Sequence, residues 1–381
     1  MRTLSTSLFA LSCFVVAACG DDTSGGGGSG GAASAAGTTT TQGTDAASTT
    51  GTNASGDATT GPGATSASST STSTSTGSGA GLLADAYPGD IGIENDPAVV
   101  WTESFEQASI EDVVARYDDA KAEGLSLDAD VPAASSGASS GRFTASGAGP
   151  NAVDLFKSFD AGYDELFVRY YVKYQADVTW HHTGVWVGGY APPTDYPNPQ
   201  AGLKPNGDDR FSVSIEPVWP GSPPRLDTYD YWMKMRSWMD QPEGDTAYYG
   251  NPLIHREDFL AQESWQCIEI RIKVNDDLAS AAGAALGVWL DDGTIAELDD
   301  QGPLGYWVRD KWCPDDTTAP ECTDYRPDAP ELVPVDLQVR TTADLAINNF
   351  WPQNYITEGG PGSVWYDDMV VATRRIGCIR P

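Results

Sequence analysis

Strict alternation of apolar and polar side chains constrains the fold of this chain more than any other feature. It is clearest in residues 166–174, 211–216 and 268–274. In the last segment three isoleucines alternate with glutamate, arginine and lysine. Successive side chains of a strand point to opposite faces, so such segments put one face in a core and leave the other polar. The pattern predicts half-buried antiparallel strands.

Further strands are expected at 285–290, 335–340, 345–350 and 363–373. Asp291-Asp292-Gly293-Thr294 follows the first of these and is typical of a tight β-hairpin. The one helical pattern is short, around Glu111–Lys121. Many strands separated by Gly- and Pro-rich turns predict an all-β, two-sheet antiparallel jelly-roll sandwich.

The N-terminal 82 residues differ from the rest in composition. Arg2 precedes an apolar stretch that is too short to span a bilayer, which predicts an export signal over 1–18. Residues 19–82 contain no aromatic residue, Lys or Arg, and a segment of this kind cannot bury enough apolar area to fold. We expect a disordered, Gly/Ser/Thr-rich tether over 19–82 and a folded domain over 83–381.

The signal ends in Val16-Ala17-Ala18-Cys19, which resembles the lipobox of bacterial lipoproteins. The resemblance implies cleavage before Cys19 and lipidation of its thiol, with acyl chains such as palmitate holding the protein on a membrane. Gly20 follows the cysteine, so an outer-membrane or cell-surface location is expected. An ordinary signal peptide, with Cys19 incidental, is the alternative.

The charge of the chain argues against one class of partner. The net charge of −32 argues against a nucleic-acid partner, because phosphate binding needs clustered Lys and Arg. No cofactor or catalytic metal is expected, and we expect a monomer. The acidic loops 275–277 and 314–316 would hold structural calcium, or are solvated turns.

Four cysteines remain in the exported domain, and three pairings are open to them. Their positions favour two disulfides, Cys313–Cys322 across a short loop and Cys267–Cys378 from a strand to the C-terminal tail. No Cys-x-x-Cys pair is present, so zinc and thioredoxin-like chemistry are not expected.

Three polar clusters could carry chemistry. The first contains His181 and His182, followed by Trp186 and Tyr190. Adjacent residues of a strand point to opposite faces, so at most one histidine faces a given groove. A histidine suits proton abstraction near neutral pH. The alternative is that one histidine packs structurally and the other is solvated.

The second cluster joins a charged turn to a strand and contains Lys204, Arg210, Ser212 and Ser214. Arg210 could bind a sugar carboxylate through both arms of its guanidinium, or pair with a neighbouring aspartate. In the third cluster, Tyr229 and Tyr231 would share a strand face about 7 Å apart, with Trp232 beside them. Two phenols so placed could line a sugar site and transfer protons, or simply cover a sheet edge.

The order of features over 100–378 resembles the concanavalin A-like lectin/glucanase sandwiches. The segment 103–106 would open the domain, the hairpin at 286–296 would form a ribbon, and 365–372 would return beside the first strand.

The three clusters resemble the alginate-lyase-like jelly rolls of polysaccharide lyase family 14. Tyr229 and Tyr231 match that family's Tyr-x-Tyr strand, and Ser212 matches its strand serine. Ser214 stands where an arginine is expected, and His181-His182-Thr183-Gly184 stands where Gly-Gly-Lys is expected. The resemblance implies β-elimination of a uronate-containing glycan. A histidine or a tyrosine would abstract the proton, with His182 in place of the missing lysine. Arg210 or Lys204 would neutralise the carboxylate, and a second tyrosine would protonate the leaving oxygen.

Glycoside hydrolysis and glycan binding without catalysis are the alternatives to elimination. Glycoside hydrolysis on this fold commonly uses Glu-x-Asp-x-Glu on one strand, and this triplet is absent from the sequence. A non-catalytic glycan-binding surface lipoprotein would use the same aromatic residues to stack on sugars. Both remaining hypotheses make polysaccharide the partner, with the lipid anchor as the only membrane contact.

Overall fold

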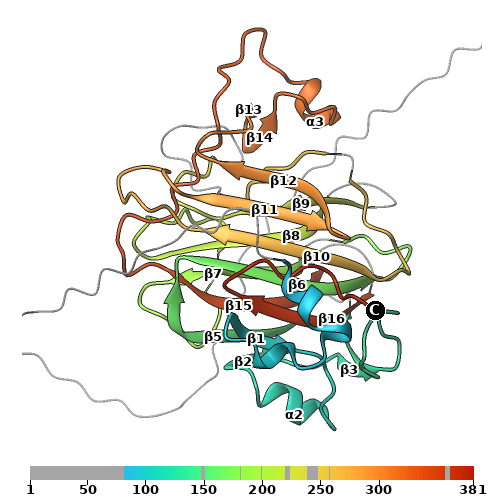
Figure 1. Ribbon diagram of the computed structural model, residues 1–381. Coiled ribbons are helices and arrows are strands. Elements are labelled where there is room, and N and C mark those ends of the chain that lie inside the picture. Colours follow the sequence, from blue (N-terminus) through green and yellow to red (C-terminus); the bar gives the residue numbers. More distant parts are fainter. Residues whose placement is uncertain are drawn as a thin grey trace, which may run out of the picture. The chain divides into compact units, whose positions relative to one another are not determined.

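The computed structural model describes residues 81–146, 151–180, 182–198, 200–218, 224–237, 248–256, 258–356 and 361–381. They form a mostly β structure in which antiparallel sheets pack as a sandwich, as the alternation predicts (Figure 1). The export signal, the lipidation of Cys19 and nearly all of the tether lie outside the described residues and stay predictions. Across the described residues, every helix is too short or too polar to cross a membrane.

The helices are α1 (Leu83–Ala86), α2 (Ile110–Val114) and α3 (Pro320–Thr323), with 3-10 turns η1 (Pro88–Asp90) and η2 (Ile93–Asn95). The larger sheet contains β1 (Val99–Glu103), β3 (Leu125–Asp128), β4 (Ser140–Ala145), β6 (Glu165–Tyr174), β10 (Gln266–Lys273), β11 (Ala285–Leu290), β12 (Gly293–Asp299) and β16 (Gly362–Ala372). The smaller sheet contains β2 (Asp119–Lys121), β5 (Asn151–Tyr163), β7 (Thr183–Tyr190), β8 (Arg210–Val218), β9 (Arg225–Thr228) and β15 (Ile347–Ile356). A separate hairpin is formed by β13 (Gly305–Val308) and β14 (Lys311–Pro314).

The larger sheet runs in the order β12-β11-β10-β6-β16-β4-β3, with β1 also paired to β16. The last strand therefore returns beside the first, as expected for this kind of sandwich. The smaller sheet runs β2-β5-β15-β7-β8-β9, and the strand pairs within both sheets are antiparallel. Figure 1 shows the two sheets one behind the other, with β13, β14 and α3 beyond the β12 edge.

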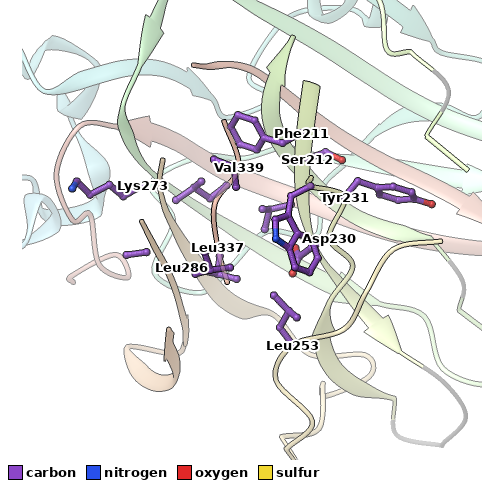
Figure 2. A pocket seen from close by; sticks show the side chains of 13 residues that line it. Phe211, Ser212, Asp230, Tyr231, Leu253, Lys273, Leu286, Leu337 and Val339 are labelled. Atoms are coloured by element: carbon purple, nitrogen blue, oxygen red, sulfur yellow. The ribbon is translucent and has the colours of Figure 1, made fainter. Parts of the chain in front are cut away.

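Strand β8 shows how the alternation divides the smaller sheet. Phe211, Val213 and Ile215 belong to the main hydrophobic core. The residues between them, Ser212 and Ser214, point to the opposite face, called the outer face below. A small interior cavity lies beside this strand, and its lining includes Val339, Leu337 and Leu286. Figure 2 shows that the hydroxyl groups of Ser212 and Tyr231 point away from these apolar side chains. The outer face is thus left for polar and aromatic side chains.

Two local predictions meet different outcomes. The hairpin is confirmed, because β11 pairs with β12 across Asp291 and Asp292, whose positive φ values of 50° and 64° suit a two-residue turn. The helix predicted over 111–121 is wrong in extent. It ends at Val114, and residues 119–121 pair with β5 as the edge strand β2.

The strand predicted at 335–340 is also wrong. Val335, Leu337 and Val339 are buried on one side, which explains the strand-like pattern. The backbone N–H groups of Val339 and Arg340 donate instead to the side-chain oxygen of Asn275, at 3.0 Å each. A buried amide side chain here takes the place of a neighbouring strand.

Two disulfides join segments of the described chain. Cys267 of β10 is joined to Cys378, and Cys313 of β14 is joined to Cys322 of α3. These are the two pairings that the cysteine positions favour. The first ties the C-terminal tail to the larger sheet, and the second closes the β14–α3 loop.

Candidate functional site

Strand register brings parts of the three predicted clusters together on the outer face. Trp186 of β7 lies opposite Ser214 of β8. On the other side of β8, the N–H of Tyr229 donates to the carbonyl of Ser214, and Tyr231 pairs with Ser212. Directly opposed residues of antiparallel strands share a face. Side chains from three distant segments therefore form one row.

His182 lies at the start of this row, beside a carboxylate and two phenol rings. Its Nδ1 is 3.3 Å from Oε2 of Glu216, and its ring centre is 4.7 Å from that of Tyr229. The ring of Tyr355 stacks on the imidazole at 6.0 Å. Glu216 is only 2% exposed, whereas His182 and Tyr229 are partly exposed. The arrangement is an imidazole held between a buried carboxylate and a phenol.

The backbone of His182 is fixed in an uncommon conformation. Its φ is 59°, a left-handed value that few residues other than glycine adopt. The carbonyl group of His182 accepts hydrogen bonds from the N–H of Tyr355 and from Nε2 of Gln353, both at 3.2 Å. Such conformations persist where the surroundings over-determine them, often at functional sites. The neighbouring His181 lies outside the described residues.

The two phenols differ in accessibility but share a protonation state. Their ring centres are 5.7 Å apart, and both rings contact Trp186. Burial raises the pKa of Tyr229 and of Tyr231 well above the usual range, and the charge of Glu216 adds to the effect. Both hydroxyl groups therefore hold their protons near neutral pH, so neither is a phenolate base in the free protein.

Gly250 sets the position of Tyr229 from behind. A Cβ atom at this glycine would lie 2.3 Å from Cδ1 of the Tyr229 ring, which is closer than van der Waals contact allows. Only glycine lets the chain lie flat against the phenol. The ring is thus held between Gly250, His182 and Trp186.

No family model matches the chain, and no curated protein matches it. Among solved structures, the marine PL-14 alginate lyase from Aplysia kurodai is similar at 11% identity and a TM-score of 0.46, covering 72% of this chain and 99% of that one. The alginate lyase vAL-1 from Chlorella virus gives 11% identity and 0.44, with coverages of 72% and 100%. The cellulose-induced protein Cip1 gives 14% identity and 0.39, with coverages of 73% and 99%.

Similarity at this level assigns no activity to the chain.

Arg210 lies away from His182. It is opposite Tyr190 at the other end of β8, four residues before Ser214, or about 13 Å at the usual rise of a strand. Its Nη1 donates to Oδ2 of Asp209 at 2.8 Å, which is the ion pair that the sequence left as the alternative. The structure therefore separates Arg210 from the imidazole with which it was predicted to act.

The other predicted binding residues have different surroundings. The hydroxyl groups of Ser212 and Ser214 are buried on the outer face and have no hydrogen-bond partner among the described residues. Nζ of Lys204 lies 5.4 Å from the centre of the Tyr248 ring, and burial, together with the charge of Lys234, lowers its pKa.

The prediction that Trp232 binds substrate is wrong. Its side chain is 2% exposed, its Nε1 donates to the carbonyl of Asp336, and its ring stacks on Trp307. Trp232 follows Tyr231 directly, so the two-residue alternation turns it to the same side as Asp230, and its ring packs into the core instead of joining the outer face.

Sequence reasoning missed Glu216, Tyr355 and Trp351. Glu216 carried a usable signal, since it follows Ser212 and Ser214 on the same alternate face of one strand. Tyr355 and Trp351 carried none, because the expected strand stopped at residue 350, whereas β15 continues to Ile356.

Among the described residues, the only three His, Cys, Asp or Glu side chains that lie close enough to share an ion are His255, Cys313 and Cys322. The two sulfurs are bonded to each other, so they offer no thiolate. In the first acidic loop, Asn275 and Asp277 are engaged by backbone groups, and Asp276 accepts from Lys273. Structural calcium stays a prediction.

Proposed function

We propose that the outer face binds a polysaccharide and that His182 and Tyr229 catalyse β-elimination within a uronate-containing chain. The observation that supports this is the contact of one imidazole with both a buried carboxylate and a protonated phenol on an aromatic sheet face. Aromatic side chains stack on sugar rings, and a histidine base works near neutral pH.

The roles follow from the contacts. With its proton on Nδ1 donated to Glu216, the imidazole presents the Nε2 lone pair as base. That atom takes the proton from C5 of the uronate, a C4–C5 double bond forms, and the C4–O4 bond breaks. The departing glycosidic oxygen receives the proton of Tyr229, which is more accessible than Tyr231. The charge of Glu216 stabilises the imidazolium that results.

The negative charge of the substrate carboxylate must be offset when the C5 proton is removed. Nε1 of Trp186 and Oγ of Ser214 lie in the same row and have no partner within the described residues. Buried donors of this kind are satisfied by a ligand or water in most proteins. They supply neutral hydrogen bonds to the carboxylate in place of the distant Arg210.

A second candidate function is glycan binding without catalysis. The buried carboxylate of Glu216 favours it, because a negative charge beside His182 repels an anionic sugar at the same place. A neutral sugar stacked over Tyr229 and Tyr355 meets no such repulsion. This function keeps the aromatic face and needs no proton transfer.

One experiment separates the two functions. The purified chain is incubated with alginate, polyglucuronate and neutral glucans, and the unsaturated product is followed by its ultraviolet absorbance. Elimination predicts a rise in absorbance that His182→Gln and Tyr229→Phe abolish with an unchanged melting temperature. Tyr355→Phe, which keeps the stacked ring, serves as the matched control. Retention on immobilised glycan without any rise in absorbance would favour the binding function.

A further inference from the structure

A second hollow lies on the smaller sheet, where β7 ends and β8 begins. It has a volume of about 490 Å³ and is lined by Tyr190 and Arg210 from the strands, and by Pro192, Thr194, Tyr196 and Asn198 from the loop between them. Hollows of about 300–1,000 Å³ are typical of small-molecule sites. Nothing in the mechanism above uses it.

Arg210 is held firmly but incompletely satisfied in this hollow. Its Nε donates to Oε1 of Gln200 at 3.2 Å, and its Nη1 donates to Asp209. Its Nη2 is buried and has no hydrogen-bond partner among the described residues. A buried donor left unpaired costs stability, so such a group points to a ligand.

The loop that forms the rim is anchored to the sheet. The hydroxyl group of Tyr190 accepts hydrogen bonds from the N–H of Asn198 and from Nε2 of Gln200, at 3.1 and 3.0 Å. Tyr196 in the same loop is 59% exposed and offers an aromatic face to solvent. The hollow is therefore preformed, with a fixed donor and an exposed ring, which are the two elements of a sugar site.

A series of aromatic ring contacts connects the hollow with the candidate active site. Rings follow one another across the outer face from Tyr190 to Phe156, Trp351, Trp186 and Tyr229, with centres 5.9 to 6.4 Å apart. Arg210 precedes Glu216 by six residues of one strand, or about 20 Å. A glycan chain of several units is long enough to reach both.

The charges of the hollow indicate the kind of sugar. Asp209 already balances Arg210, and Asp195 also lines the hollow. A second anion here would meet a net negative surrounding, whereas a hydroxyl oxygen can accept the hydrogen bond of Nη2 without that repulsion. We infer that this hollow is a distal subsite for a neutral sugar unit of the same chain, an inference that rests on the proposed glycan binding of the outer face.

The test compares ligand lengths by calorimetry. The probes are neutral glucan and mannan oligosaccharides of two and eight units, and oligomannuronates of the same lengths. Arg210→Gln and Tyr196→Ala should each weaken binding of a neutral octamer by about three- to tenfold, the effect of one lost hydrogen bond or ring contact, and should not weaken that of a dimer. Tyr325→Ala, at a tyrosine that is 69% exposed near α3, is the control.

Other results overturn the inference. An equal loss for both lengths, no loss for any octamer, or a larger loss for the oligomannuronate than for the neutral octamers would each do so. If the length-dependent loss is found while no glycan gives an unsaturated product, the subsite stands and the elimination proposal fails.

Discussion

At the scale of single residues, burial decides which groups can release a proton. Tyr229 and Tyr231 flank Asp230, which faces the opposite way and lines the interior cavity (Figure 2). Burial raises the pKa of Asp230 well above its usual range, and the charges of Asp227 and Glu216 add to this. Burial therefore favours the protonated form of all three consecutive side chains, although only the phenols lie on the outer face.

Asp230→Asn should stabilise the protein at neutral pH. In the unfolded chain this carboxyl ionises near pH 4, whereas the folded state retains the proton, so stability falls as the pH rises above about 4. The amide cannot ionise, and this loss disappears. The melting temperature of the variant should exceed that of the parent at pH 7 and match it at pH 3.5. Asp316→Asn, at an exposed side chain, is the control, and an equal change at both pH values would contradict the assignment.

At the scale of elements, strand pairing around β8 brings the candidate site residues together. Two disulfides cross-link other segments of the chain. Cys267–Cys378 spans 111 residues of chain and Cys313–Cys322 spans 9. A disulfide lowers the entropy of the unfolded chain more when the loop that it closes is longer. The resulting stabilisation of the folded state is about 5 kcal/mol for the long loop and about 2.5 kcal/mol for the short one.

Replacing both cysteines of Cys267–Cys378 by serine should therefore lower the free energy of unfolding about twice as much as the same replacement at Cys313–Cys322. Urea unfolding measures both values. A greater loss for the short loop would show that the β14–α3 contact, rather than chain entropy, is the main contribution.

At the scale of the whole molecule, the net charge of −32 governs the approach of any charged ligand. A polyuronate is repelled by this surface, and salt screens the repulsion, since the Debye length falls from about 30 Å at 0.01 M to about 8 Å at 0.15 M. Binding of a polyuronate should therefore strengthen between these salt concentrations, while binding of a neutral glycan should stay constant. Affinity electrophoresis at both concentrations is a direct measurement. Weaker polyuronate binding at the higher salt concentration would instead reveal a local basic surface that dominates the net charge.

The amino-acid pattern alone predicts the all-β sandwich, because two-residue alternation fixes which face of each strand is buried. It also determined the β11–β12 hairpin, since Asp291 and Asp292 tolerate positive φ, and the histidine and tyrosines on which the proposed chemistry depends. These features are local, or follow from a period that can be counted along the chain.

Tertiary structure alone decided which of these residues meet. The pairing of β7 with β8, and of β8 with the segment after β9, places His182 beside Glu216 and Tyr229 but leaves Arg210 about 20 Å along β8 from Glu216. Asn275 replaced a strand that alternation had predicted, because its side chain accepts the backbone hydrogen bonds of residues 339 and 340. Register between distant strands, and a side chain that satisfies another segment's backbone, leave no periodic signal in the sequence.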